Sequence, residues 1–147
     1  MDIDEIDKRI INILLEDARL SFRQLAKRAG ISVATALKRT KILEKEVIIT
    51  GYHAELDYEP LGYQFEVIIN IKVGSGKLAE VEKRIANIPN VLQVFDVTGN
   101  YDSMVIARFK TRRELDAFLK KIQQLDFVRK TNTILILQRV KSKKMSL

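Results

Sequence analysis

The sequence predicts an α+β fold in two parts, three helices followed by a sheet built from two β-α-β units. Up to about residue 46 the apolar residues recur at the three- and four-residue spacing of amphipathic helices. From Tyr63 onward the spacing changes to two, as in half-buried strands, and two helical stretches interrupt these strands. Because the β-α-β order occurs twice in succession, we expect the second part to be a ferredoxin-like βαββαβ domain.

The segment between the two parts is polar and contains Pro60 and Gly62, which is typical of a hinge. We therefore divide the chain into a helical domain (1–48), a linking strand and hinge (49–62), the ferredoxin-like domain (63–140) and a basic tail (141–147).

The composition is that of a globular protein with an anionic partner. Of the 147 residues, 46% are hydrophobic, which is enough for a sizeable core, and the net charge is +7. No apolar run approaches the roughly 18 residues of a membrane span, and the acidic N-terminal residues are unlike a signal peptide. The lack of cysteine excludes disulfides and thiolate metal sites. We expect a cytoplasmic protein that makes no contact with membranes.

The first two helices have clear boundaries in the sequence. Asp2 or Asp4 can cap the first helix, whose apolar face consists of Ile3, Ile6, Ile10, Ile13 and Leu14. The second begins after Ser21, which has capping-box spacing to Gln24, and ends at Gly30, where the left-handed conformation is readily available. Its apolar face consists of Phe22, Leu25, Ala26 and Ala29.

A third helix follows at once, because Ser32 is a natural N-cap only two residues after Gly30. Small side chains at Ala26 and Ala36 would let the second and third helices cross closely. We place Ala36, Thr40, Leu43 and Val47 on its packed side and Thr35, Lys38, Arg39 and Ile42 on its outer side. Two helices around so short a turn predict a helix-turn-helix domain, winged-helix-like in type.

The charge of residues 19–45 is almost entirely positive, since eight Lys and Arg residues oppose only Glu44. A basic helix-turn-helix predicts double-stranded DNA as the partner, with the third helix in the major groove. A solvated basic face on an ordinary three-helix unit is the alternative. The predicted DNA contacts are Arg23, Ser32, Thr35, Lys38, Arg39 and Lys41.

The remaining elements follow from composition and period. Residues 47–56 are rich in β-branched and aromatic side chains, which favours an extended strand. In the second domain we expect strands at 65–73, 91–98, 103–110 and 127–138, a helix at 78–88, and a helix that is capped by Thr111 and extends to Leu125.

Both faces of this predicted sheet carry apolar residues, although the two helices of such a fold lie on one face. Ile68, Met104, Ile106, Ile134 and Ile136 supplement the alternating core positions. A second copy of the sheet is the economical cover, which predicts a homodimer. A moderately apolar exposed sheet is the alternative.

In these features the chain resembles the Lrp/AsnC (leucine-responsive or feast/famine) family of transcriptional regulators over nearly its whole length. The matching motifs, in order, are Asp4-Glu5-Ile6-Asp7, Asp17-Ala18-Arg19, Ser21-Phe22-Arg23-Gln24-Leu25-Ala26, Gly30-Ile31-Ser32, Leu43-Glu44, Gly51-Tyr52, Leu61-Gly62-Tyr63 and Val97-Thr98-Gly99-Asn100-Tyr101-Asp102. The resemblance implies that the ferredoxin-like half binds effectors and oligomerises, that dimers assemble further, and that small molecules, often amino acids, bind between dimers.

Three positions depart from the family pattern. Glu46 replaces a usual glycine at the end of the third helix, so we expect strain at the exit toward Val47. Thr40 replaces a usual apolar residue and Ile42 a usual basic one, which bears on the choice of DNA sequence.

The effector site is expected at Thr98, Gly99, Asn100, Tyr101 and Asp102. The amides of a glycine turn could receive a ligand carboxylate, and Asp102 supplies a negative group for an α-ammonium. These groups suit the two ends of an amino acid. The alternative is an ordinary hairpin turn in which Asp102 bonds only its own loop.

We expect no catalytic residues, metal site or cofactor. Residues 73–77 lack the first glycine and the Ser or Thr of a phosphate-binding loop. His53 is the only histidine, which leaves little material for histidine-based catalysis or metal binding. A siroheme decarboxylase of the same two-domain build is the alternative class, and the intact basic helix argues against it.

Overall fold

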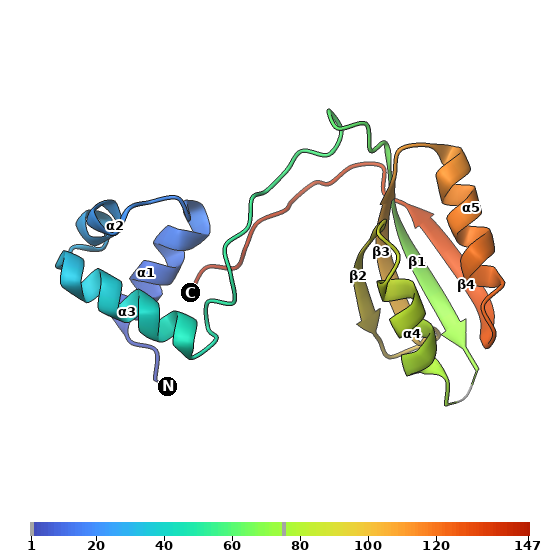
Figure 1. Ribbon diagram of the computed structural model, residues 1–147, viewed down its shortest axis with the longest axis horizontal. Coiled ribbons are helices and arrows are strands. Elements are labelled where there is room, and N and C mark those ends of the chain that lie inside the picture. Colours follow the sequence, from blue (N-terminus) through green and yellow to red (C-terminus); the bar gives the residue numbers. More distant parts are fainter. Residues whose placement is uncertain (1, 75) are drawn as a thin grey trace. The chain divides into compact units, whose positions relative to one another are not determined.

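The computed structural model describes residues 2–74 and 76–147, and the chain forms two compact units (Figure 1). One unit contains the residues up to Glu55 together with Lys141–Leu147, and the other is Leu56–Val140. The division at residue 55 lies inside the predicted linking segment. Ser75, in the rejected phosphate-loop motif, lies outside the described residues.

The N-terminal unit is built from the helices α1 (Glu5–Glu16), α2 (Phe22–Ala29) and α3 (Val33–Lys45). Each begins at a predicted cap, since the side chains of Asp4, Ser21 and Ser32 accept backbone N–H groups of the first turn. Gly30 ends α2 in the left-handed conformation, at φ 67°. The local signals of the sequence therefore set the lengths of all three helices.

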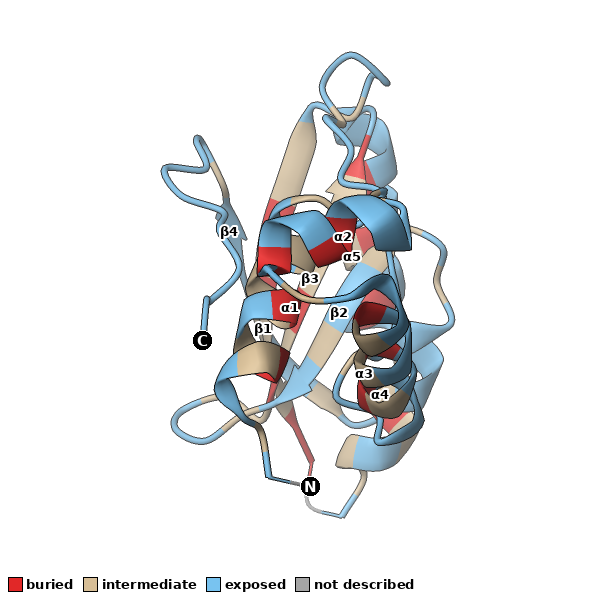
Figure 2. Ribbon diagram, turned by 90° about the vertical axis from the view of Figure 1, so that its left-hand side faces the viewer, coloured by how far each residue is buried: buried red, intermediate tan, exposed pale blue. Residues whose placement is uncertain are grey.

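The core of this unit consists of Ile10, Leu25, Ala26, Ala29, Ala36 and Leu43, which lie on the red, inward sides of the helices in Figure 2. Ala26 and Ala36 are 2% and 0% exposed, so their small side chains do allow α2 and α3 to pack closely. The predicted packed side of α3 is confirmed for Ala36, Thr40 and Leu43. It is wrong for Val47, which lies beyond the helix and is 69% exposed.

The end of α3 shows where the expected strain lies. The N–H of Ile48 donates to the carbonyl of Leu43 at 2.9 Å, and that of Val47 to the carbonyl of Glu44 at 3.0 Å, which is the Schellman pattern. Glu46 has an ordinary φ of −79°, whereas Val47 occupies the left-handed position at φ 57°. A β-branched residue is strained there, so the cost falls on Val47 and not on Glu46.

The linking strand expected within residues 47–62 is a correction. The strands of the described chain begin only at Phe65, so the helical unit contains no strand that could form a wing. A strand requires a hydrogen-bonded neighbour, and the strands described here pair with one another in the C-terminal unit. The left-handed Val47 also turns the backbone out of the extended region directly after α3.

The C-terminal unit contains, in order, β1 (Phe65–Val73), α4 (Leu78–Ala86), β2 (Val91–Asp96), β3 (Ser103–Phe109), α5 (Arg112–Gln123) and β4 (Val128–Leu135). The strand order in the sheet is β2-β3-β1-β4, and every neighbouring pair is antiparallel. This is the ferredoxin-like arrangement, so the predicted fold class is confirmed.

Both helices of this unit pack against one face of the sheet. Alternate residues of β1 and β3 form a single buried cluster with side chains from α4 and α5, namely Val67, Ile69, Ile71, Val105, Ala107, Val81, Ile85, Phe118 and Ile122. On the other face Ile68 lies opposite Ile106 and Ile134, and Phe95 lies opposite Met104. Ile134 and Phe95 are 46% and 42% exposed, so this second apolar face is open.

The basic tail belongs with the N-terminal unit. The side-chain amide of Asn12 in α1 donates to the carbonyl of Leu147 at 2.8 Å and accepts from its N–H at 2.9 Å. These two hydrogen bonds fix one end of the 141–147 segment on α1.

Candidate functional site

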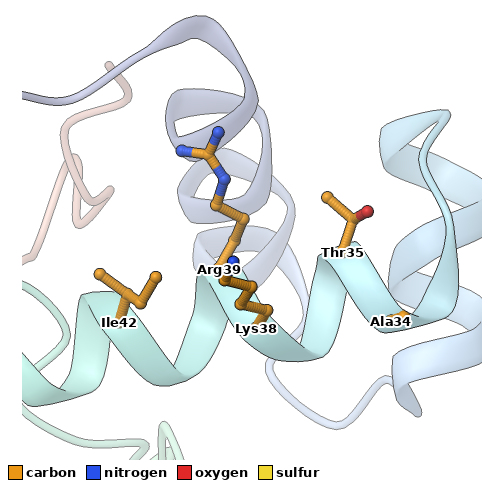
Figure 3. A pocket seen from close by; sticks show the side chains of 5 residues that line it. All are labelled: Ala34, Thr35, Lys38, Arg39 and Ile42. Carbon is orange, nitrogen blue, oxygen red and sulfur yellow. The ribbon is translucent and has the colours of Figure 1, made fainter.

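The outer face of α3 is the first candidate site. Ala34, Thr35, Lys38, Arg39 and Ile42 line a shallow hollow along it (Figure 3). Because Ala36, Thr40 and Leu43 are buried on the opposite side of the same helix, these side chains are held outward by the packing of the domain. The structure thus brings together the central members of the predicted DNA contacts.

Three of the predicted cations keep their charge available. Lys38 and Lys41 are exposed on α3, and Arg23 is exposed on α2. Within the described residues none of the three forms a salt bridge with a carboxylate. An unpaired cation on a helix that is held in place can bind a phosphate without first breaking an internal ion pair.

The two hydroxyl residues at the start of α3 are linked to each other. Ser32 caps the helix by accepting the N–H of Thr35 at 3.1 Å, and its hydroxyl lies 2.8 Å from that of Thr35. This pair fixes the first turn of α3, the part of a recognition helix that contacts base edges in helix-turn-helix proteins.

Arg39 has a second role, inside the domain. Its Nη1 lies 2.8 Å from Oδ2 of Asp4 and 3.2 Å from Oδ2 of Asp7, and Figure 3 shows the side chain reaching toward α1. Asp7 is 0% exposed, so the guanidinium compensates a buried charge. A hydrogen bond from the backbone of Asp7, together with Arg39, holds the pKa of Asp4 below its ordinary value. The assignment of Arg39 as a DNA contact stays a prediction.

The two departures in α3 lie in different places. Thr40 is 2% exposed in the core, so its side chain is remote from any groove of DNA, whereas Ile42 lines the outer hollow. Of these two residues, only Ile42 can influence DNA recognition by direct contact.

The loop between β2 and β3 is the second candidate site. The N–H of Val97 donates to the carbonyl of Asp102 at 3.0 Å and closes the loop. Gly99 has φ 110°, which an L side chain rarely adopts, and a Cβ placed there would meet no described atom within 4 Å. Thr98, Gly99 and Asn100 are exposed, and Tyr101 and Asp102 are half-buried. The predicted residues therefore surround an open turn.

The carboxylate of Asp102 is already occupied by β1. Oδ2 accepts the N–H of Val73 at 2.8 Å, and Oδ1 accepts the ammonium of Lys72 at 3.0 Å. The hydrogen bond from Val73 and the ion pair with Lys72 hold the pKa of Asp102 below its ordinary value. Sequence reasoning missed Lys72, although a basic residue in a mostly apolar strand was an available signal.

Other classes of site are not indicated. In residues 2–74 and 76–147, no group of three or more His, Cys, Asp or Glu residues could hold a metal ion. The helices of the described chain include none that is long and apolar enough to cross a membrane.

Comparison with known proteins defines the class. Residues 3–44 match the AsnC-type helix-turn-helix domain, and residues 66–145 match the Lrp/AsnC ligand binding domain. The two units therefore make a transcriptional regulator with a helix-turn-helix domain and a ligand-binding domain. The chain belongs to the Lrp/AsnC family, which consists of transcriptional regulators and not of enzymes.

Individual relatives agree with this placement. An uncharacterized HTH-type transcriptional regulator of Pyrococcus furiosus is 43% identical over 141 residues, which cover 96% of this chain and 95% of that protein. The structure of Escherichia coli AsnC has a TM-score of 0.92 at 25% identity and covers 100% of both chains. A Neisseria meningitidis transcriptional regulator in complex with L-Met has a TM-score of 0.91 at 26% identity, with 99% of this chain and 96% of that chain covered.

Proposed function

We propose that this regulator binds specific DNA sequences through the outer face of α3 and changes its activity when an amino acid binds to the C-terminal domain. The observation that carries the proposal is the presence of unpaired cations on the face of α3 opposite its buried side. A cytoplasmic location stays a prediction from the sequence.

In this proposal the contacts divide by chemistry. Lys38 and Thr35 lie in the outer hollow, where they are suited to base edges or to phosphates. Arg23, Ser32 and Lys41 would contact the backbone and set the register of the helix. Arg39 would act chiefly by holding α3 against α1 through its ion pairs with Asp4 and Asp7.

Sequence specificity is tested by selecting binding sites genome-wide with the purified protein and then measuring affinity at fixed salt. The selected site should bind at least about a thousandfold more tightly than a scrambled duplex of equal length. Equal affinity for the two duplexes would leave a DNA-binding protein without sequence specificity and would contradict this part of the proposal.

The effector part of the proposal is supported by the L-Met complex of the structural neighbour and by the open turn at Gly99. Thermal shift with L-methionine and the other standard L-amino acids should yield at least one stabilising ligand. At one hundred times its Kd, such a ligand raises the free energy of unfolding by about 2.7 kcal/mol.

Asp102→Ala should abolish this response while the protein keeps its fold and its affinity for DNA. Asp126→Ala is the matched control, because Asp126 is exposed and lies outside the turn. If no amino acid stabilises the intact oligomer, or if Asp102→Ala responds as the parent does, the turn is not an effector site.

We further propose a homodimer closed by the open faces of two sheets, with assembly to higher oligomers. The exposed side chains of Ile134 and Phe95 support it, since the face is apolar and uncovered. Such a dimer would present two recognition helices to half-sites about one helical turn, or a multiple of it, apart.

Met104→Glu or Ile106→Glu should shift the particle to monomer in light scattering, because dimerisation would bury an unpaired charge. Ala79→Glu, on the exposed side of α4, is the control and should leave the mass unchanged. A parent protein that is monomeric at micromolar concentration would contradict the dimer.

A further inference from the structure

The ion pair between Lys72 and Asp102 lies where the proposed effector turn joins the sheet. Lys72 Nζ lies 3.0 Å from Asp102 Oδ1, and the two side chains are 42% and 30% exposed. Both partners therefore reach solvent, and neither is buried in the core. Sequence reasoning assigned Asp102 to the effector site but gave Lys72 no role.

Each member of this pair keeps unused hydrogen-bonding capacity. The ammonium of Lys72 has three N–H donors, of which one is directed to Asp102. Oδ1 of Asp102 accepts from Lys72 alone among the described residues, and a carboxylate oxygen can accept two hydrogen bonds. A ligand could thus bind both groups without separating them.

We infer that Lys72 and Asp102 together recognise the zwitterion of an α-amino acid, with the ligand carboxylate on Lys72 and the ligand ammonium on Asp102. The inference rests on the proposed effector function and assigns its chemical selectivity. It also moves the carboxylate from the amides of the Gly99 turn, where sequence reasoning placed it, to a side chain on β1.

Charge balance is the reason for this selectivity. The pair is neutral as a whole, so an amine without a carboxylate would compete with Lys72 for Asp102. A carboxylate without an amine would compete with Asp102 for Lys72. Only a ligand with both charges leaves all four groups paired, and charge-assisted hydrogen bonds are the strong ones.

The surrounding charges give the ligand a direction. Lys130 on β4 is the cross-strand partner of Lys72, so both side chains project from the same face of the sheet. The β1–β4 side of the site is therefore positive and suits the carboxylate. The loop that ends at Asp102 is the side for the ammonium, and the space beside Gly99 is open to the ligand.

The test uses the full-length protein and calorimetry. The L-amino acid with the largest thermal shift is compared with its α-amide, which lacks the carboxylate, and with its 2-hydroxy acid, which lacks the ammonium. We expect the parent to bind each analogue at least tenfold more weakly than the amino acid. Lys72→Met, which keeps the aliphatic stem, should bind the amino acid at least tenfold more weakly and no longer prefer it to the amide.

Two further variants separate charge recognition from a general loss of structure. Lys72→Arg should bind the amino acid within a few fold of the parent, because the cation is restored. Lys83→Met is the matched control, since Lys83 is exposed on α4, and it should bind as the parent does. Asp102→Asn should lose the preference for the amino acid over the 2-hydroxy acid.

The outcomes distinguish this inference from the proposal on which it rests. A parent that binds none of the amino acids overturns the effector proposal and this inference together. A parent that binds one of them as tightly as its amide, or a Lys72→Met protein that binds and discriminates as the parent does, overturns the inference alone. The comparison of analogues on the parent decides the matter even if a variant fails to fold.

Discussion

The ion pair between Arg39 and Asp7 gives a quantitative prediction about how α3 is held. Arg39→Ala removes the guanidinium that lies 3.2 Å from Oδ2 of Asp7 and leaves that carboxylate buried. Its remaining described partner is the N–H of Asp4, at 3.3 Å. Asp7→Asn instead removes the buried charge and keeps an oxygen that can accept this hydrogen bond.

The size of the effect follows from burial. Removing one partner of a buried ion pair costs about 3–5 kcal/mol, while an exposed pair such as that of Arg39 with Asp4 contributes about 0–1 kcal/mol. The side chain of Arg39 is 32% exposed, so water reaches the site and the lower part of the range applies. We expect Arg39→Ala to cost about 2–3 kcal/mol in the parent and about 1 kcal/mol in the Asp7→Asn background.

Hydrogen exchange of the amides in α1, α2 and α3 measures this directly, because it reports the opening free energy of the N-terminal unit in the intact protein. The double-mutant cycle should show a coupling of at least about 1 kcal/mol between positions 7 and 39. Single-variant costs that add to within about 0.5 kcal/mol would refute the reasoning that Arg39 compensates Asp7.

Three further predictions concern the same unit. Val47→Asn should raise the free energy of unfolding by about 1 kcal/mol in urea denaturation, because asparagine tolerates the left-handed conformation that costs valine about 1–2 kcal/mol; an unchanged or lower value would contradict it. Thr40→Val should stabilise by about 1 kcal/mol, since the buried hydroxyl of Thr40 has no hydrogen-bond partner among the described residues; destabilisation would show that the hydroxyl is satisfied in solution. Burial and the hydrogen bond to Glu44 raise the pKa of Tyr52 to about 12. The neutral hydroxyl therefore stabilises the fold fully below about pH 10, the usual value for tyrosine, and this contribution is lost as the pH rises through about 12. Ultraviolet titration of the parent and of Tyr52→Phe checks this, and a parent whose tyrosines all ionise near pH 10 would contradict it.

The sequence was a good guide wherever structure depends on nearby residues. The caps at Ser21, Ser32 and Thr111 formed as predicted, because a cap requires only a side chain and an N–H two or three residues away. The strands of the sheet followed from the two-residue period, which one buried face imposes. The linking strand did not form, because the composition of residues 47–56 measures β-propensity and says nothing about a pairing partner.

The candidate sites were predicted only in part, for the same physical reason. The outer face of α3 follows from its 3.6-residue period, which places Lys38 opposite the buried Leu43 side. The pairs of Arg39 with Asp7 and of Lys72 with Asp102 join residues 32 and 30 positions apart. Whether such residues meet depends on how two helices cross or on the register of two strands, and neither is set by local pattern.

The central claim is that the outer face of α3 binds DNA, and the salt dependence of DNA affinity tests it most directly. The equilibrium constant for the selected duplex is measured by fluorescence anisotropy over a range of salt concentrations for the parent, Lys38→Ala and Lys8→Ala. Lys8 is a lysine of α1, outside the predicted interface, and serves as the control. We predict that Lys38→Ala weakens binding and, where Lys38 contacts a phosphate, reduces the slope of log K against log salt by about 0.9, whereas Lys8→Ala matches the parent. A folded Lys38→Ala protein with the affinity and slope of the parent, or an equal loss in Lys8→Ala, would contradict the claim.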